Sequence, residues 1–265
     1  MAECRDAALT LAHAFAADDY AQYLVADDGG ACDAGSDEDG NVGGGGGGGR
    51  SRGLTTEEDK WRLHVDILTY TVASHCMSGL VKAVGAECDA VALWGPPGKH
   101  LDSWWTQLRS GMWRMYFQLS PEGRKRYFDE IVPRLHDAKV QVLGDRENDA
   151  WFLAYLGTKP NSQGRGYAAK LLRDMMARAD AEKRPIYLES SSQANNAYYE
   201  KFGFEVKQDV FLERGPVPVR LSIMVREPRK VAYTAGPSSS LSSSSSPMGK
   251  KKKFVVGAAK GLRRG

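Results

Sequence analysis

The sequence predicts a single α/β domain that combines a β-sheet with several helices. Three observations support this fold class. An apolar run at 151–156 leads through a glycine-containing loop into an amphipathic helix, which is a strand–loop–helix succession. Two later stretches, 204–210 and 219–225, alternate apolar and polar residues on either side of a Gly-Pro turn, as the strands of a hairpin do. Several other segments repeat apolar residues at helical spacing.

The 265-residue chain begins with a helical segment and continues into an acidic, glycine-rich insertion. Within 1–26, a short helix is predicted over 7–24, with apolar residues at Leu11, Phe15 and Leu24. Residues 27–53 combine acids with seven consecutive glycines and almost nothing apolar, so we expect a disordered insertion. The glycine run lacks a strand before it and a helix after it, so we interpret it as a linker and not as a phosphate loop.

The next part, which opens the main domain segment 54–228, should form a helix followed by two strands. Thr55 and Glu58 have the spacing of a capping box, which marks a helix start. The apolar face of this helix is predicted to be Trp61, Val65, Leu68 and Val72, and its end lies near Gly79. Residues 80–85 and 90–94 are predicted to be short strands.

Two helices are predicted between these strands and the central one. The first covers 101–119, and the second begins with Pro121 and buries Phe128, Ile131 and Leu135. Pro133 is expected to bend the second helix. The pair would form an insertion between two strands of the sheet. We interpret its aromatic residues as core packing and not as a cofactor site; they are Trp104, Trp105, Trp113, Tyr116 and Phe117.

The remaining elements follow the central strand in regular order. They are a helix over 163–182, a strand over 185–190, a helix over 194–202 and the hairpin 204–225. Residues 229–265 contain a serine run and Lys250 to Lys253 but no core-forming content, so we expect a disordered tail. The lysine run allows two interpretations, a nuclear address or a solubilising tail, and both remain open.

Charge and composition exclude several classes of protein. Residues 1–49 carry a net charge of −9 and residues 229–265 a net charge of +9, whereas the whole chain carries +3. The middle is thus nearly neutral, and no specific nucleic-acid partner is expected. No apolar run approaches a membrane span, so no membrane partner is expected. The histidines and cysteines form no ligand spacing, which argues against a metal site.

The four cysteines indicate a reducing compartment. Cys4, Cys32, Cys76 and Cys88 show no pairing pattern, and no signal peptide precedes them. We therefore expect reduced thiols in a cytoplasmic protein.

The loop over 163–168 has the properties of an anion-binding site. A helix that follows a tight loop presents unpaired N–H groups and the positive end of its dipole. Glycines allow the backbone to approach the anion, and Arg165 adds a side-chain charge. A Walker loop is excluded because the Gly-Lys-Ser/Thr ending is missing. A dinucleotide fold is disfavoured because the loop lies late in the chain.

The loop, with its Gln-x-x-Gly-x-Ala pattern, resembles the acetyl-CoA loop of the GNAT acyltransferases. The downstream Leu188-Glu189-Ser190-Ser191 and the Asn195-Asn196-Ala197-Tyr198-Tyr199-Glu200-Lys201-Phe202-Gly203-Phe204 segment resemble the second half of the same family's signature. The branch of puromycin N-acetyltransferase and its fungal relatives looks most similar. The resemblance is strong over 150–228 and loose over 3–130. It implies the GNAT fold, a mixed and mostly antiparallel sheet with helices on both faces. The family's first strand is missing here.

The resemblance also implies a site for acetyl-CoA as co-substrate. The loop would hold its pyrophosphate through Gln163, Gly164, Arg165, Gly166, Tyr167 and Ala168. The backbone of Leu156, Gly157 and Thr158 would hold the pantetheine arm. Asn195 would bind the pantetheine or the sheet, or would simply cap its helix.

Two residues carry the expected chemistry. Tyr199 matches the tyrosine that protonates the leaving thiolate, and a phenol has a suitable pKa for this role. Its neighbour Tyr198 should point away around the helix. Glu189 is the candidate base, and a surface or ion-paired glutamate is the alternative.

The expected function is transfer of an acetyl group from acetyl-CoA to the amine of a small molecule. A protein or peptide N-acetyltransferase is one alternative. A non-catalytic acyl-CoA-binding relative is another. No metal is expected, and the oligomeric state stays open.

Overall fold

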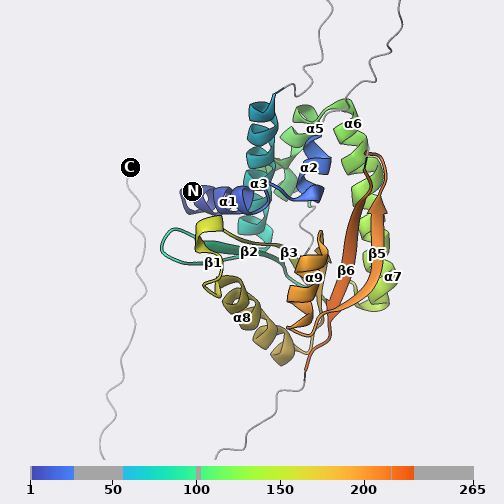
Figure 1. Cartoon of the computed structure of the whole chain (residues 1–265). Coiled ribbons are helices and arrows are strands. Elements are labelled where there is room, and N and C mark those ends of the chain that lie inside the picture. The colour runs from blue at the N-terminus through green and yellow to red at the C-terminus, as the bar shows by residue number, and fades with distance from the viewer. Residues whose placement is uncertain (1, 27–55, 100–102, 216, 230–265) are drawn as a thin grey trace, which may run out of the picture. The chain divides into compact units, whose positions relative to one another are not determined.

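The protein is built on one six-stranded sheet with the strand order β1-β2-β3-β4-β6-β5 (Figure 1). A computed structural model describes residues 2–26, 56–99, 103–215 and 217–229. The strands are β1 Leu80–Val84, β2 Ala90–Gly95, β3 Trp151–Thr158, β4 Ile186–Ser190, β5 Glu205–Leu212 and β6 Val219–Arg226. Every neighbouring pair is antiparallel except β3 and β4. The prediction of a mixed, mostly antiparallel sheet is therefore confirmed.

The two parallel strands stay together over only part of their length. β3 pairs with β4 through Trp151, Phe152 and Leu153, whereas β3 continues to Thr158. The second half of β3 pairs only with β2 on its other side. A gap between β3 and β4 therefore opens in the middle of the sheet, and the edge of β3 from residue 154 onward has no strand beside it.

Helices cover both faces of the sheet, as predicted. The main ones are α1 Ala2–Ala14, α3 Glu57–Ser78, α8 Tyr167–Glu182 and α9 Gln193–Glu200. Val91 and Leu93 of β2 pack with α1 and α3, whereas their neighbours Ala92 and Trp94 pack with α8. Because side chains alternate along a strand, α1 and α3 lie on one face and α8 on the other (Figure 1).

The N-terminal segment forms two helices and not the one that the sequence predicts. α1 ends at Ala14, and α2, Asp19–Val25, begins after a break in which the Asp18 side chain accepts a hydrogen bond from the Ala21 N–H at 3.1 Å. Asp18 is a strong N-cap residue, and this explains the new helix start. No strand precedes α1 among the described residues.

Gly157 allows α1 to lie directly on β3. A Cβ at this position would stand 2.9 Å from side-chain atoms of Leu11 and Ala14. Any larger residue at position 157 would therefore push α1 away from the sheet.

The residue that caps the start of α3 is one position later in the chain than predicted. Thr55 falls outside the described residues, and Thr56 is the N-cap, whose hydroxyl accepts from the Asp59 N–H at 3.1 Å. The prediction that Thr55 and Glu58 form the box is therefore wrong by one position. The two adjacent threonines and three consecutive acids made this register ambiguous in the sequence.

The predicted helix over 101–119 is also wrong, because it is broken into short pieces. α4 covers Trp104–Ser110, a 3₁₀ turn covers Met112–Arg114 and α5 covers Met115–Gln118. The break lies at Gly111, whose φ of 83° is left-handed and ends α4.

The next helical stretch is continuous but uneven. α6, Pro121–Arg124, passes through a π-helical segment, Lys125–Ile131, into α7, Val132–Leu143. The wide turns lie directly before Pro133, which has no N–H to donate to the preceding turn.

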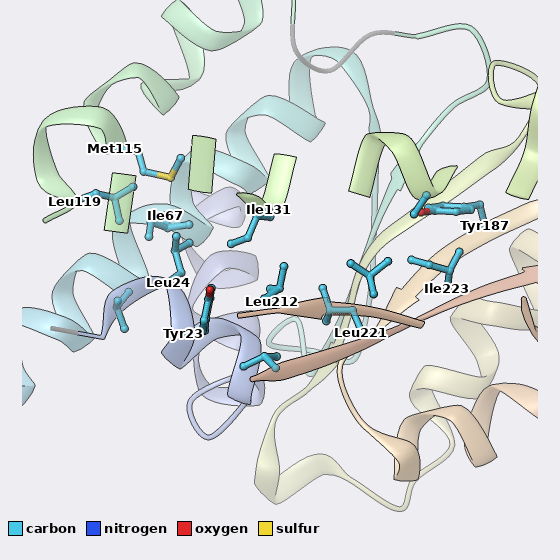
Figure 2. Packing of buried hydrophobic residues seen from close by; sticks show 14 of the residues in the cluster. Tyr23, Leu24, Ile67, Met115, Leu119, Ile131, Tyr187, Leu212, Leu221 and Ile223 are labelled. Carbon is cyan, nitrogen blue, oxygen red and sulfur yellow. The ribbon is translucent and has the colours of Figure 1, made fainter. Parts of the chain in front are cut away.

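The aromatic residues of this insertion are exposed, which contradicts the prediction that they form core. The exposed fractions are 65% for Trp104, 61% for Trp105, 47% for Trp113, 49% for Tyr116 and 73% for Phe117, and Phe128 is also exposed at 41%. The core in this region contains Met115, Leu119 and Ile131 (Figure 2).

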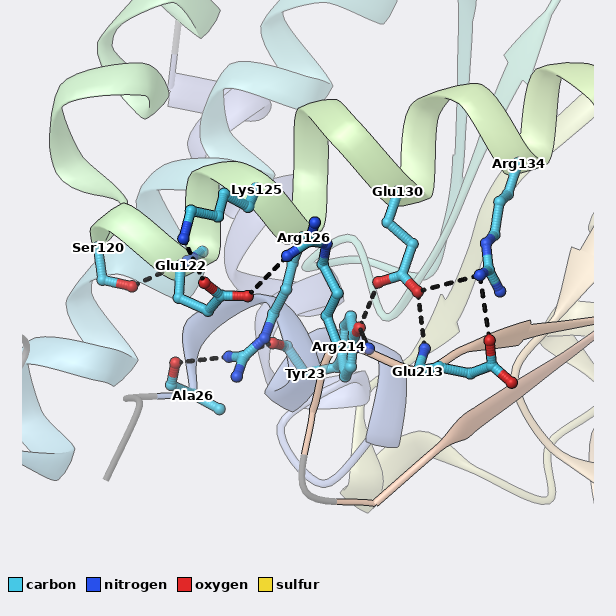
Figure 3. A network of polar contacts seen from close by, with 11 residues as sticks. Tyr23, Ala26, Ser120, Glu122, Lys125, Arg126, Glu130, Arg134, Glu213 and Arg214 are labelled. Atoms are coloured by element: carbon cyan, nitrogen blue, oxygen red, sulfur yellow. Dashed lines mark hydrogen bonds and ion pairs between the residues drawn. The ribbon is translucent and has the colours of Figure 1, made fainter. Parts of the chain in front are cut away.

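A buried polar network fixes α2 against the insertion and the β5–β6 turn (Figure 3). The Tyr23 hydroxyl donates to Glu130 at 2.5 Å, and the backbone N–H groups of Glu213 and Arg214 donate to Glu130 and to Tyr23. Burial and the Glu130 carboxylate raise the pKa of Tyr23 to about 12. The network holds α2 in place beside the cavity described below.

The remaining strands, α8, α9 and the final hairpin confirm their predictions within a few residues. α8 begins at Tyr167 and not at Gln163, because the preceding loop is not helical.

Cys4 and Cys76 lie with their Sγ atoms 3.0 Å apart, a proximity that their sequence spacing does not indicate. No helix in the described part of the chain is long and apolar enough to cross a membrane. The predicted insertion 27–53 lies outside the described residues, as does the predicted tail except for Arg229.

Candidate functional site

A cavity of about 840 Å³ lies where β3 and β4 separate. Residues from both faces of the sheet line it. Leu188 and Tyr199 lie on the face of the sheet that packs with α8. Tyr155 and Tyr187 lie on the opposite face, which packs with α3. Glu189 follows Tyr187 by two residues on β4, so it lies on that opposite face as well. The cavity therefore passes through the sheet. Every site residue proposed from the sequence lines it except Arg165.

One end of the cavity is the loop before α8. Gly164 and Gly166 adopt left-handed conformations with φ of 76° and 78°, and apart from each glycine and its two chain neighbours no described atom lies within 4 Å of the place that a Cβ would take. No side chain caps α8. The N–H groups of its first turn, from Tyr167 onward, therefore face open space beside the cavity, as anion binding requires.

Arg165 has a different place from the loop's other residues. Its side chain is exposed and donates a hydrogen bond to the Asn161 carbonyl at 3.4 Å. It does not line the cavity, so the structure does not bring it together with the other predicted residues.

The unpaired edge of β3 continues from the loop. Leu156, Gly157 and Thr158 pair with β2 and line the cavity. Among the described residues, this part of β3 has no strand beside it on the β4 side, so backbone groups that point there are available to an extended ligand.

α9 places two tyrosines at the middle of the cavity. Tyr199 packs edge-on against Phe204, with ring centroids 5.7 Å apart, and burial raises the pKa of its hydroxyl. That hydroxyl has no hydrogen-bond partner among the described residues. Tyr198 also lines the cavity, with its ring 5.8 Å from that of Tyr199. The expectation that Tyr198 points away is therefore wrong.

Asn195 does not cap α9. Ser192 is the N-cap, and its hydroxyl accepts a hydrogen bond from the Asn195 N–H at 3.2 Å. The Asn195 side chain is exposed at the cavity wall, and its binding to the pantetheine or to the sheet stays a prediction. The neighbouring Asn196 is buried and donates to Ser222 at 2.9 Å.

Glu189 lies on β4 where the strands part. It is half-buried, lines the cavity and accepts a hydrogen bond from the Tyr187 hydroxyl at 3.0 Å. Burial raises the pKa of Glu189 to about 7, although the Tyr187 bond and the nearby charge of Lys139 oppose this shift. No salt bridge joins it to a cation in the described structure. The alternative of a surface or ion-paired glutamate is therefore wrong, and Glu189 can exchange a proton near neutral pH.

Three tyrosines beyond Glu189 were missed by sequence reasoning. Tyr20 of α2, Tyr127 of the π-helical segment and Tyr155 of β3 line the same end of the cavity, and we call them the distal tyrosines. Burial raises the pKa of each, and the Glu189 charge raises that of Tyr20 and Tyr155 further. Nothing in their sequence spacing indicates that they meet.

His75 is a further residue without a sequence signal. Its Nδ1 lies 2.8 Å from the Thr71 carbonyl oxygen, and the buried Nε2 has no partner among the described residues. Burial lowers the pKa of His75, so the ring at this cavity wall is neutral at pH 7. In the described part of the chain, no three His, Cys, Asp or Glu side chains come together as metal ligands would.

Comparison with known proteins identifies relatives of this chain. A family model described as an acetyltransferase (GNAT) domain matches residues 130–206. An uncharacterized N-acetyltransferase of Schizosaccharomyces pombe is 41% identical over 191 residues, which cover 71% of this chain and 77% of that protein.

Solved structures show more distant likeness. The structure of histone acetyltransferase HPA2 and related acetyltransferase from Corynebacterium glutamicum has 17% identity and a TM-score of 0.46, over 88% of this chain and 94% of that one. Arabidopsis thaliana Naa50, in complex with the bisubstrate analogue CoA-Ac-MVNAL, has 20% identity and a TM-score of 0.27, over 29% of this chain and 54% of that one.

Proposed function

This chain belongs to the GNAT family of N-acetyltransferases, and from that premise we propose that it moves an acetyl group from acetyl-CoA to the amine of a small molecule. One observation carries the proposal. A single cavity joins the uncapped start of α8, the Tyr199 hydroxyl and Glu189 through the gap between β3 and β4. An acyl transfer needs a donor site, an acid and a base along one path.

The donor end fits acetyl-CoA. The open space at Gly164 and Gly166 leaves room for a pyrophosphate against the backbone, and the first turn of α8 supplies N–H donors. The pantetheine arm would then run along the unpaired edge of β3 at Leu156 to Thr158. This route leads the thioester toward Tyr199.

Glu189 is proposed as the base. An amine reaches the enzyme mostly as an ammonium ion and must lose a proton before it can attack the thioester carbon. With its pKa raised to about 7, the ionised Glu189 accepts that proton directly or through a water molecule.

Tyr199 is proposed as the acid. Burial raises its pKa, so its hydroxyl stays protonated throughout the neutral range. It has no hydrogen-bond partner among the described residues, so it can donate to the sulfur as negative charge develops there during cleavage of the C–S bond. Protonation of the thiolate completes the transfer.

A small acceptor fits the distal end of the cavity. Tyr20, Tyr127 and Met115 line the cavity there and come from three separate helical segments. The test is a screen of small primary amines and of peptides with free N-termini, read by release of CoA thiol and by the mass of the product. Turnover of peptides alone would favour the peptide alternative. Binding of acetyl-CoA without any turnover would favour the non-catalytic one.

Gly166→Val should abolish the binding of acetyl-CoA. A β-branched residue is strained at a φ of 78°, so the loop must change its backbone and move its N–H groups. In the native protein, acetyl-CoA at about 100 times its dissociation constant should stabilise the fold by roughly 2.7 kcal/mol. The measurement is the thermal shift caused by acetyl-CoA.

Gly144→Val is the matched control for this loop variant. Gly144 also has a positive φ, 56°, with open space around it, but it lies at the end of α7 and does not line the cavity. This variant should melt earlier than the native protein and keep the full shift. An equal shift in the Gly166 variant would show that the loop does not bind the donor.

We also propose that residues 27–53 and 229–265 are dispensable for catalysis, because their composition lacks core-forming residues. Limited proteolysis that removes both segments should leave kcat/KM unchanged. Loss of turnover after trimming, with the remaining domain still folded, would contradict this division.

A further inference from the structure

The distal end of the cavity has an unusual balance of charge. Two acids, Asp18 and Glu189, line the cavity, and no Lys or Arg lines it among the described residues. The histidine there, His75, is neutral because burial lowers its pKa. Lys139 is close enough to influence Glu189 but lies outside the wall. An acceptor at this end therefore meets negative charge without a compensating cation.

Asp18 is fixed in place by the fold. One carboxylate oxygen accepts the Ala21 N–H at 3.1 Å, and the other accepts the Ser191 hydroxyl at 2.5 Å. Its charge therefore stays near the junction of α2 and β4, beside the cavity. Glu189, by contrast, has only the Tyr187 hydroxyl as a partner and can turn toward an acceptor.

The distal tyrosines add an aromatic wall. Phe15 packs edge-on against Tyr155 with ring centroids 5.3 Å apart, and both line the cavity with Tyr20 and Tyr127. Aromatic faces attract cations and tolerate apolar groups. The three tyrosine hydroxyls have no hydrogen-bond partners among the described residues, so they are available to polar hydrogens of an acceptor.

Together these features favour one class of acceptor. Resting on the proposed function, we propose that the acceptor is a cationic amine that carries no carboxylate or phosphate group near its nitrogen. Like charges in a partly desolvated site repel strongly, and among the described residues no Lys or Arg at the cavity wall offsets an anionic group beside Asp18 and Glu189. The ammonium is attracted by the same arrangement, and Glu189 then removes its proton.

Pairs of acceptors that differ by a single carboxylate test this inference. Suitable pairs are tyramine with tyrosine, phenethylamine with phenylalanine, and putrescine with ornithine. For the native full-length chain, kcat/KM is measured by release of CoA thiol at pH 8. We expect the preferred amines to exceed their amino-acid partners by at least about 100-fold.

A change of charge at the wall gives a second readout. Tyr20→Lys places a cation at the distal end and should reduce the ratio of amine to amino acid at least tenfold. Tyr20→Phe keeps the ring without adding charge, so its ratio should equal that of the native protein. If Tyr20→Lys does not fold, the ratio measured with the native protein still decides the question.

The outcomes separate this inference from the proposed function. Efficient turnover of amines and amino acids at similar rates would overturn the inference and leave the acetyltransferase intact. Preference for the amino acids would overturn it as well. Failure of every acceptor, together with the absence of a thermal shift by acetyl-CoA, would contradict the proposed function and remove the basis of the inference.

Discussion

Glu189→Gln should lower kcat by about 100- to 10,000-fold, the range of general-base contributions. The amide keeps the size of the side chain and can still accept the hydrogen bond from Tyr187, so the wall should remain intact. It cannot take a proton from an ammonium ion. The measurement is the rate of CoA thiol release with the best amine of the screen.

The pH profile makes this expectation specific. In the native protein kcat should rise as the pH passes through about 7, because only ionised Glu189 accepts the proton. Besides burial, the Tyr187 hydroxyl and the charge of Lys139 influence the pKa of Glu189. Glu189 in turn raises the pKa of the neighbouring Tyr20 and Tyr155. The residual rate of the variant should lack this step. A native profile without a step near pH 7 would show that another group is the base.

The same substitution should stabilise the fold at higher pH. The pKa of Glu189 is raised from 4.5 in the unfolded chain to about 7 in the fold, so the unfolded chain loses this proton first as the pH rises. The free energy of unfolding of the native protein therefore falls between about pH 4.5 and 7, and it stays at the lower value above pH 7. The variant should melt close to the native protein at pH 4.5 and above it at pH 8. Glu200→Gln, at an exposed position of α9 outside the cavity wall, should change neither rate nor stability.

Tyr199→Phe should also lower kcat by about 100- to 10,000-fold, with the Michaelis constants little changed. The ring and its contact with Phe204 remain, so cofactor binding should persist. Only the proton donor is lost. Steady-state kinetics with saturating acetyl-CoA measure the effect.

Two further tyrosine variants serve as the control and the comparison for Tyr199→Phe. Tyr116→Phe changes an exposed side chain that does not line the cavity and should behave like the native enzyme. Tyr198→Phe tests the other hydroxyl at the cavity wall. A large loss in Tyr198→Phe with a normal Tyr199→Phe would move the acid by one position. Normal turnover in both would mean that water protonates the thiolate.

The sequence was most informative where local pattern and tertiary position agree. The apolar run of β3, the glycine loop and the face of α8 are adjacent in the chain, so their order alone predicts a strand, a candidate anion-binding loop and a helix. The hairpin of β5 and β6 was predictable for the same reason, because alternation and a turn define it locally. The predicted N-cap of α3 differs from the observed one by a single residue.

The insertion helices and the distal end could not be predicted in this way. Gly111 is left-handed and ends α4, so the predicted helix over 101–119 is broken, and its aromatic rings are exposed. The distal tyrosines come from three separated elements that meet near Glu189 only in the folded chain. Such contacts arise from packing and leave no periodic signal in the chain.

A crystal structure of the full-length protein with acetyl-CoA tests the central claim most directly. The account predicts that the pyrophosphate oxygens accept hydrogen bonds from the N–H groups of residues 164–168. It also predicts that the pantetheine follows the edge of β3 at Leu156 to Thr158 and that the thioester lies between Tyr199 and Glu189. A pyrophosphate bound elsewhere, or a thioester out of reach of the Tyr199 hydroxyl, would contradict it.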